Sequence, residues 1–148
     1  MPEKSGFPTL RSIRSLTLRY NIPITKTAKF WDGLKKGKIL TTKCRRCGHL
    51  YFPPTADCPS CLSSDMEWVA LSGDAELETF TQVAIKPSSF NQFEPYIVAV
   101  GKLREGVRVL AWLTGVELGD AKVGMKLRLV TKMREGRPTY EFIPAPRE

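Results

Sequence analysis

Residues 44–61 read CRRCGHLYFPPTADCPSC, and this stretch holds all four cysteines of the chain in two pairs. Two residues separate the cysteines within each pair, and ten residues separate the two pairs. Two intervening residues let both sulfurs of a pair reach one ion from a tight turn, and two such turns complete a tetrahedron. The spacing therefore predicts a single structural metal ion, with no open ligand position, bound by Cys44, Cys47, Cys58 and Cys61.

The residues next to the cysteines differ between the two turns. Gly48 follows the first pair, where its freedom at positive φ helps the chain turn so that backbone N–H groups face sulfur. Pro59 stiffens the second turn. Leu62 stands where a second glycine would be expected, so we predict that the second turn is slightly less regular than the first.

Zinc is the ion that we expect for a closed set of four thiolates. Iron stays open as the alternative, because CxxCG with CPxC also resembles a rubredoxin ligand set. The N-terminus, MPEKSGFPTL, lacks the apolar core of a secretory signal, and no apolar run approaches the roughly 20 residues of a membrane span. We therefore expect a soluble, cytoplasmic protein, in which two disulfides are disfavoured.

Upstream of the cysteines, the apolar pattern indicates two amphipathic helices. Residues 8–20 place Leu10, Ile13, Leu16 and Tyr20 at helical spacing. A second helix is expected to begin with Thr25 as its N-cap and to stop at Gly37. Neither segment is long enough to be a stable helix alone, so we expect both to pack on the rest of the chain.

Downstream, the sequence favours short strands. Strand-like segments flank both cysteine pairs, and five more strands are predicted at 75–85, 96–103, 107–113, 125–131 and 139–143. Five short strands in about 75 residues fit a small barrel, for which the oligonucleotide/oligosaccharide-binding (OB) fold is the commonest choice. The fold class is therefore mainly β with N-terminal helices, and the predicted division is 1–37 helical segment, 38–70 zinc ribbon and 71–148 barrel.

Positive charge is concentrated in the first third of the chain. Residues 1–50 hold 12 Lys and Arg against two acidic residues, whereas the remaining chain holds 11 basic and 13 acidic residues. A localised positive field attracts phosphate-rich ligands, acidic proteins or nucleic acid.

The sequence offers few parts for catalysis. His49 is the only histidine, and it follows the first cysteine turn, where an exposed structural role is expected. All four cysteines are committed to the metal, and no GxSxG, Walker or GxGxxG motif is present. We therefore predict no catalytic residues and a protein that is not an enzyme.

Short motifs follow one another along nearly the whole chain: FW…GLKKGKI, CxxCG…FPP…CPxC, EW…SG, PYIVAV, EGVRVLAWLTG, VGMKLRLV and EFIPA. Their order resembles a known family of two-domain zinc-ribbon/OB-fold proteins, the acyl-CoA-associated proteins long catalogued as a domain of unknown function. The resemblance implies two N-terminal helices, a rubredoxin-like zinc ribbon and a C-terminal OB barrel. It also implies partners among thiolases, hydroxymethylglutaryl-CoA synthases, and steroid-side-chain hydratases or aldolases. No catalytic residues of the family map onto this chain.

We therefore expect a non-catalytic acyl-CoA-binding or scaffold protein that partners a thiolase-type enzyme. A CoA thioester, with phosphates at one end and an apolar acyl chain at the other, suits the charge layout. The cluster Lys35, Lys36, Lys38, Lys43, Arg45 and Arg46 could meet the phosphates, and Phe30, Trp31, Tyr51 and Phe52 could line the pantetheine or acyl path. For each of these residues, a solvated charge or an ordinary core position is the competing interpretation.

Nucleic-acid binding is the alternative function, because zinc ribbons, OB barrels and a pI near 9.5 occur together in such proteins. An OB barrel that binds single strands needs a positive groove with stacking aromatics. Here the positive charge lies upstream of the predicted barrel, so this mode is disfavoured.

Overall fold

The computed structural model describes Leu18 and residues 21–146, so the helix predicted at 8–20 lies outside the described residues. The second helix, α1 (Ala28–Lys35), begins after Thr27 and not after Thr25. The predicted N-cap is wrong because the Thr27 N–H bonds to the Ile24 carbonyl at 2.8 Å, which holds the preceding residues in a turn. None of the described helices has the length and apolar character that a membrane crossing needs.

The predicted helix stop at Gly37 is confirmed. The Lys38 N–H bonds to the Gly33 carbonyl at 2.8 Å, and the Gly37 N–H bonds to the Leu34 carbonyl at 3.2 Å. This pair of bonds is a Schellman motif, which requires a left-handed residue after the helix. Gly37 supplies it with a φ of 74° and so turns the chain into the first strand.

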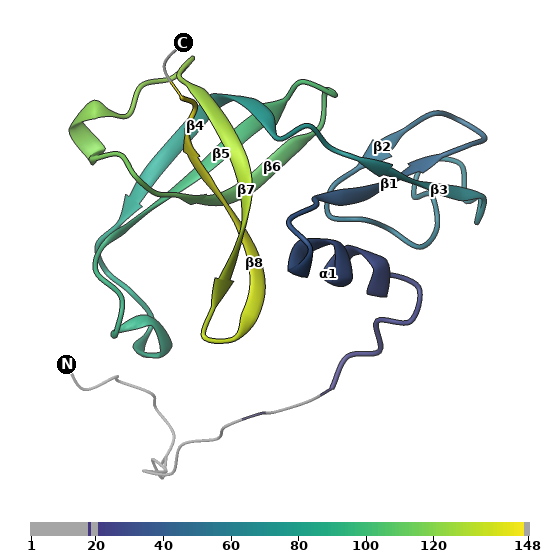
Figure 1. The fold of residues 1–148 in the computed structure, drawn as a ribbon, viewed down its shortest axis with the longest axis horizontal. Helices are drawn as coiled ribbons and strands as arrows, with labels where there is room; N and C mark the ends of the chain where they lie inside the picture. Colours follow the sequence, from purple (N-terminus) through teal and green to yellow (C-terminus); the bar gives the residue numbers. More distant parts are fainter. Residues whose placement is uncertain (1–17, 19–20, 147–148) are drawn as a thin grey trace, which may run out of the picture.

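The two cysteine pairs belong to a small antiparallel sheet (Figure 1). Its strands are β1 (Leu40–Cys44), β2 (Leu50–Tyr51) and β3 (Met66–Ala70), in the order β2-β1-β3. β1 is central because it pairs with β2 through Thr42 and Lys43 and with β3 along its whole length. The short segments predicted beside the cysteines are therefore strands.

The remaining strands close into a barrel, in agreement with the prediction. They are β4 (Asp74–Val83), β5 (Tyr96–Leu103), β6 (Arg108–Leu113), β7 (Lys126–Arg134) and β8 (Arg137–Pro144), in the closed order β4-β5-β6-β8-β7. Two single turns of 3-10 helix, η1 (Ser88–Phe90) and η2 (Leu118–Asp120), lie in the connections. A register shift at Glu78 lets β4 bend and pair with β5 on one side and β7 on the other.

The barrel interior is filled by alternate residues of each strand. Leu77, Leu103, Val109, Leu127 and Phe142 are at most 2% exposed. The Phe142 ring occupies the space above Gly101, where an added Cβ would lie 2.5 Å from its Cζ. Gly101 therefore makes room for Phe142, the largest of the fully buried side chains.

Three aromatic rings join the helix, the ribbon and the barrel. Phe30 of α1 lies 5.9 Å from the ring of Phe52, which follows β2, and 6.1 Å from the ring of Tyr140 in β8. Phe52 and Tyr140 are 5.1 Å apart, and all three pairs meet edge to face. We refer to these three residues as the aromatic junction. It holds α1 between the ribbon and one end of the barrel (Figure 1).

Replacing Gly101 with Ala is expected to lower the free energy of unfolding by about 1–3 kcal/mol, because the new methyl group would clash with Phe142 in a filled core. Urea unfolding monitored by circular dichroism measures the change. Gly119→Ala is the matched control, since nothing lies within 4 Å of its added Cβ. Equal stability of the two variants would show that the barrel can repack around residue 101.

Candidate metal centre

The cysteine turns have the same backbone geometry. The Gly48 N–H bonds to the Cys44 carbonyl, and the Leu62 N–H bonds to the Cys58 carbonyl, both at 2.9 Å. Gly48 and Leu62 both adopt left-handed backbone, with φ of 76° and 58°. The prediction of a less regular second turn is therefore wrong. Leu62 accepts the conformation, which costs about 1–2 kcal/mol for a residue with a Cβ, because its side chain points into solvent.

The four sulfurs lie together, as the spacing predicted. All four Sγ atoms are within 4.8 Å of one another. The Sγ atoms of Cys44 and Cys61 are 3.6 Å apart, and those of Cys47 and Cys58 are 3.4 Å apart. Thiolates about 2.3 Å from one ion lie about 3.8 Å apart at tetrahedral corners, whereas a disulfide brings two sulfurs to about 2.05 Å. The cluster of free cysteines therefore fits one tetrahedrally bound ion.

Hydrogen bonds around the sulfurs favour a thiolate at Cys58. Burial raises the pKa of Cys58, but the Tyr51 hydroxyl, 3.0 Å from its Sγ, and the N–H groups of Cys61 and Ser60 outweigh burial and lower the pKa to about 6. At Cys47, a backbone hydrogen bond from His49 lowers the pKa, but desolvation and the neighbouring sulfurs raise it to about 12. A charged thiolate at Cys58 thus disfavours ionisation of Cys47, and a bound cation removes this penalty.

Two side chains beside the sulfurs were not predicted as neighbours of the metal ligands. The His49 Nδ1 lies 3.2 Å from the Cys47 Sγ, and the imidazole stacks on Tyr51 with ring centroids 6.2 Å apart. Tyr51 in turn bonds to Cys58. Residues that contact metal ligands orient them and tune their basicity. The alternation His49-Leu50-Tyr51 carried the signal, because residues two apart in a strand share a face.

The residues expected to bind ligand are Phe30, Trp31, Lys35, Lys36, Arg45, Arg46, Tyr51 and Phe52. The Phe30 ring contacts those of Trp31 and Phe52, with centroids 5.1 Å and 5.9 Å away. Phe30 and Phe52 belong to the aromatic junction, and Tyr51 contacts the metal cluster. Trp31 lines a pocket on the side of the barrel.

The basic members of this set are exposed, and two of them have acidic partners. The Lys35 Nζ lies 3.6 Å from Asp32, and Arg45 lies 3.7 Å from Asp65 and 3.4 Å from Glu67. Exposed ion pairs of this kind contribute about 0–1 kcal/mol to stability. They nevertheless reduce the positive field that a phosphate would meet at Arg45.

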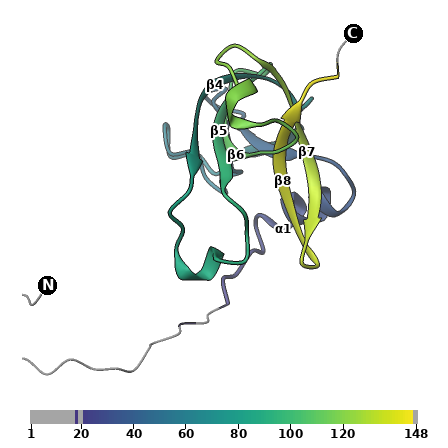
Figure 2. The ribbon, with the colours of Figure 1, turned by 90° about the vertical axis from the view of Figure 1, so that its left-hand side faces the viewer.

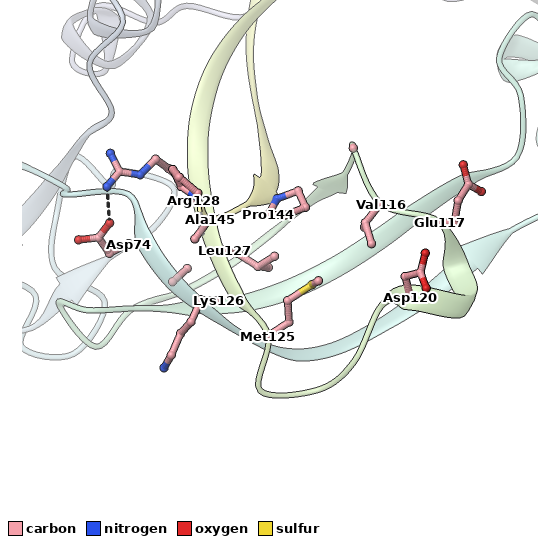
Figure 3. Close-up of a pocket in the computed structure, with 13 residues that line it drawn as sticks. Asp74, Val116, Glu117, Asp120, Met125, Lys126, Leu127, Arg128, Pro144 and Ala145 are labelled. Carbon is pink, nitrogen blue, oxygen red and sulfur yellow. Dashed lines mark hydrogen bonds and ion pairs between the residues drawn. The ribbon is translucent and has the colours of Figure 1, made fainter. Parts of the chain in front are cut away.

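A wide pocket of about 1640 Å³ lies at the end of the barrel away from α1. Figure 3 shows Glu117 and Asp120 at one side of it and the Asp74–Arg128 ion pair, 2.8 Å long, at the other. Small-molecule sites usually enclose about 300–1,000 Å³ and converge a few polar groups on the ligand. Here the charged groups are spread along the rim, so the pocket has the character of an open groove.

Replacing Tyr51 with Phe is expected to weaken metal binding about 10–100-fold, because the thiolate of Cys58 loses a hydrogen-bond donor and its pKa rises. Competition with a chromophoric chelator at pH 7 measures the affinity. Tyr140→Phe is the matched control, since that hydroxyl belongs to the barrel side of the aromatic junction. An unchanged affinity in Tyr51→Phe would remove Tyr51 from the set of residues that tune the site.

Comparison with known proteins identifies both parts of the chain. Residues 31–67 match the family model described as the rubredoxin-like zinc ribbon domain of ChsH2, and residues 68–132 match that of the C-terminal OB-fold domain of ChsH2. A DUF35 domain-containing scaffold protein of Pyrococcus furiosus is 38% identical over 112 residues, which cover 74% of this chain and 82% of that protein. The benzoylsuccinyl-CoA thiolase subunit BbsA of Thauera aromatica is 31% identical over 105 residues, covering 68% of this chain and 72% of the subunit.

A solved structure shares the same architecture. One chain of the Ltp2-ChsH2(DUF35) aldolase superposes with a TM-score of 0.73 at 27% identity, covering 86% of this chain and 100% of that chain. The agreement extends over ribbon and barrel together. The predicted resemblance is thus confirmed, and the chain belongs to the DUF35 family of proteins, which join a rubredoxin-like zinc ribbon to an OB-fold barrel.

Proposed function

We propose that this chain is a non-catalytic scaffold of acyl-CoA metabolism, which docks on a thiolase-type enzyme and presents or retains its CoA thioester. The observation that carries the proposal is the similarity to a DUF35 scaffold protein over most of both chains. Relatives named as a thiolase subunit and as part of an aldolase assembly support the class of partner. A hydroxymethylglutaryl-CoA synthase is a second partner of the same class.

The chemistry of the side chains supports a non-catalytic role. The sole histidine lies against a cysteine of the metal cluster, so it is not positioned to serve as a base in a barrel pocket. Glu141 is the buried acidic residue of the described chain, and its oxygens accept hydrogen bonds from Thr114, Lys132 and Arg134. Both oxygens of this carboxylate are thus occupied by donors from the protein itself, which gives Glu141 a structural role.

The charge layout of the barrel disfavours the nucleic-acid alternative. Along its strands, Lys126 pairs with Glu76 and Arg108 pairs with Glu78, each at 2.6 Å, and Arg128 pairs with Asp74. Binding of single strands needs a continuous positive groove. On the described barrel, these basic side chains alternate with acidic ones, so such a groove is interrupted.

The metal that we propose is zinc, held by the four cysteines. Metal analysis of protein purified without added metal is expected to find one zinc ion per chain and a colourless protein, because zinc has a filled d shell. Stoichiometric iron, together with visible absorption, would show that the bound metal is iron and not zinc.

Chelation is expected to unfold the proposed ribbon, residues 38–70, and to leave the barrel folded. Closed four-cysteine sites contribute folding free energy directly, whereas the barrel core has its own buried side chains. Hydrogen exchange measured with and without chelator should show lost protection in β1–β3 and retained protection in β4–β8. Loss of protection in both parts would show that ribbon and barrel unfold as one unit.

Affinity capture from the source organism tests the scaffold role. The tagged full-length chain is expected to co-purify with an enzyme of the thiolase or hydroxymethylglutaryl-CoA synthase class. Size-exclusion chromatography of the two purified proteins should then show a stable complex. Thioester turnover should occur with the enzyme and not with this chain alone. Turnover by the isolated chain, or the absence of any such enzyme among captured proteins, would contradict the proposal.

A further inference from the structure

The closed barrel has one strand junction with only two paired positions. β6 and β8 run parallel and pair at Trp112 with Glu141 and at Leu113 with Phe142. Toward the end of the barrel near α1, residues 108–111 of β6 and 137–140 of β8 have no pairing with each other. We call this opening the seam. It lies between the third and fifth strands of the barrel.

Backbone groups of both strands point into the seam. The Thr114 N–H crosses from β6 to the Phe142 carbonyl at 2.9 Å. Since alternate residues of a strand point their N–H and C=O to the same side, Leu110 directs both groups into the seam. Tyr140 directs only its N–H there, because its carbonyl faces the Trp112 N–H in the ladder between β6 and β8. Pro138, which also faces it, has no N–H to lose, and proline is tolerated at such an edge. Leu110 therefore offers a donor and an acceptor without a protein partner strand, and Tyr140 offers a further donor.

A stack of flat groups ends beside the seam. Tyr96 and Trp112 stack with ring centroids 4.2 Å apart and an interplanar angle of 16°. The guanidinium carbon of Arg134 lies 3.9 Å from the Trp112 ring centroid, on the same ring system. Guanidinium planes stack on aromatic rings and on nucleic-acid bases alike. The stack thus passes from Tyr96 of β5 to Trp112 of β6 and ends with the Arg134 cation of β7.

Glu141 fixes that cation in place. Its side chain is 3% exposed, and its Oε2 accepts from the Arg134 Nη2 at 2.9 Å. Its Oε1 accepts from the Lys132 Nζ at 2.7 Å and from the Thr114 hydroxyl at 2.8 Å. Two cations on one carboxylate leave a net positive charge, and Arg134 keeps further N–H donors for another acceptor. The guanidinium is therefore pre-oriented for an anionic ligand.

A pocket of about 340 Å³ lies in the seam. Its walls include Trp31 of α1, Phe90 of η1, Leu110 of β6 and Arg134, with Thr139 and Tyr140 of β8. None of the described residues that line it is acidic. Figures 1 and 2 show that the 84–95 connection and the β7–β8 hairpin extend from the same end of the barrel, near α1. OB barrels bind ligands on this face, between the corresponding loops.

We propose that the seam pocket binds the purine nucleotide portion of a ligand. The heterocycle stacks against Arg134 and Trp31, its donor and acceptor edge meets the free backbone of Leu110, and a phosphate meets the Arg134 guanidinium. Adenine presents a donor and an acceptor side by side, and bases taken out of a duplex are read by stacking and edge hydrogen bonds in the same way. The adenosine phosphate end of a CoA thioester is the source that rests on the function proposed above; a free purine nucleotide shares its chemistry.

The observations favour a nucleotide over an acyl chain. An acyl chain needs an apolar pocket and cannot form hydrogen bonds with a guanidinium or with free backbone groups. Its binding would remove water from these polar groups without replacing their hydrogen bonds, which costs free energy. The positive residues at Arg45 and Arg46, by contrast, have neither a pocket nor a stacking surface among their described contacts, and Arg45 faces Asp65 and Glu67.

Tryptophan fluorescence tests the position of the ligand. Trp31 and Trp112 line the pocket, whereas Trp68 lies in the ribbon strand β3. In a Trp68→Phe background, CoA, adenosine 3′,5′-bisphosphate and ATP are titrated, with pantetheine as the probe that lacks the nucleotide. Quenching by CoA and the bisphosphate, without quenching by pantetheine, is the expected result.

Calorimetry of variants then tests the residues. Arg134→Lys keeps the charge beside Glu141 but loses the planar stack, and Trp31→Ala removes an exposed wall; each is expected to weaken binding of CoA about tenfold. Arg128→Ala, at the far end of the barrel, and the double variant Arg45→Ala/Arg46→Ala are the controls and should bind as the unaltered protein does. Circular dichroism confirms that each variant is folded.

The outcomes separate this proposal from the scaffold role. Binding of ATP but not of CoA would support the purine site and remove CoA from the proposed function. CoA affinity that falls in Arg45→Ala/Arg46→Ala and not in Arg134→Lys would overturn the seam and leave the CoA role standing. A complex with the thiolase-type enzyme but no binding of any nucleotide would overturn the seam alone. Binding confined to single-stranded DNA, falling steeply with salt, would overturn it as well.

Discussion

The aromatic junction is the contact on which the arrangement of this protein depends. An eight-residue helix is too short to be stable in water, and a ribbon of about 30 residues buries too little apolar surface to fold without a cross-link. Phe30, Phe52 and Tyr140 bring these two weak elements onto the barrel. Each aromatic pair adds about 0.5–1.5 kcal/mol beyond simple burial. The same contact sets Trp31, the next residue of the helix, beside the seam.

Much of the fold could be predicted from the sequence, because its signals are local. The cysteine spacing gives the two turns, and apolar alternation such as Leu127 and Leu129 gives the barrel strands. Gly37 ends the helix as expected. The errors are also local in origin: a turn bond at Thr27 competes with capping at Thr25, and an exposed leucine accepts the left-handed conformation of a glycine.

The metal ligands could be predicted from their spacing, whereas the surface sites could not, because they depend on contacts between distant residues. Clustering of basic residues along the chain suggested a phosphate site, but Asp65 and Glu67, twenty residues onward, neutralise Arg45. Phe30 and Phe52 pack in or against the core, and their expected part in a ligand path stays a prediction. The seam needs the strand order, since it exists where β6 and β8 diverge. Its acid, Glu141, looks like an ordinary strand residue until Lys132 and Arg134 are placed beside it.

The shortness of β2 has a consequence for crowded solutions of this protein. An open sheet can recruit further chains by strand addition at its edges, the route by which many β proteins aggregate. The ribbon offers two residues at the β2 edge, too few to template another strand, and the five strands beside it are closed into a barrel. Of the two edges of the ribbon sheet, growth by strand addition is therefore confined to β3, where Glu67 places a charge along the strand. Self-association through the ribbon edges is thereby limited, which would suit the scaffold role proposed above.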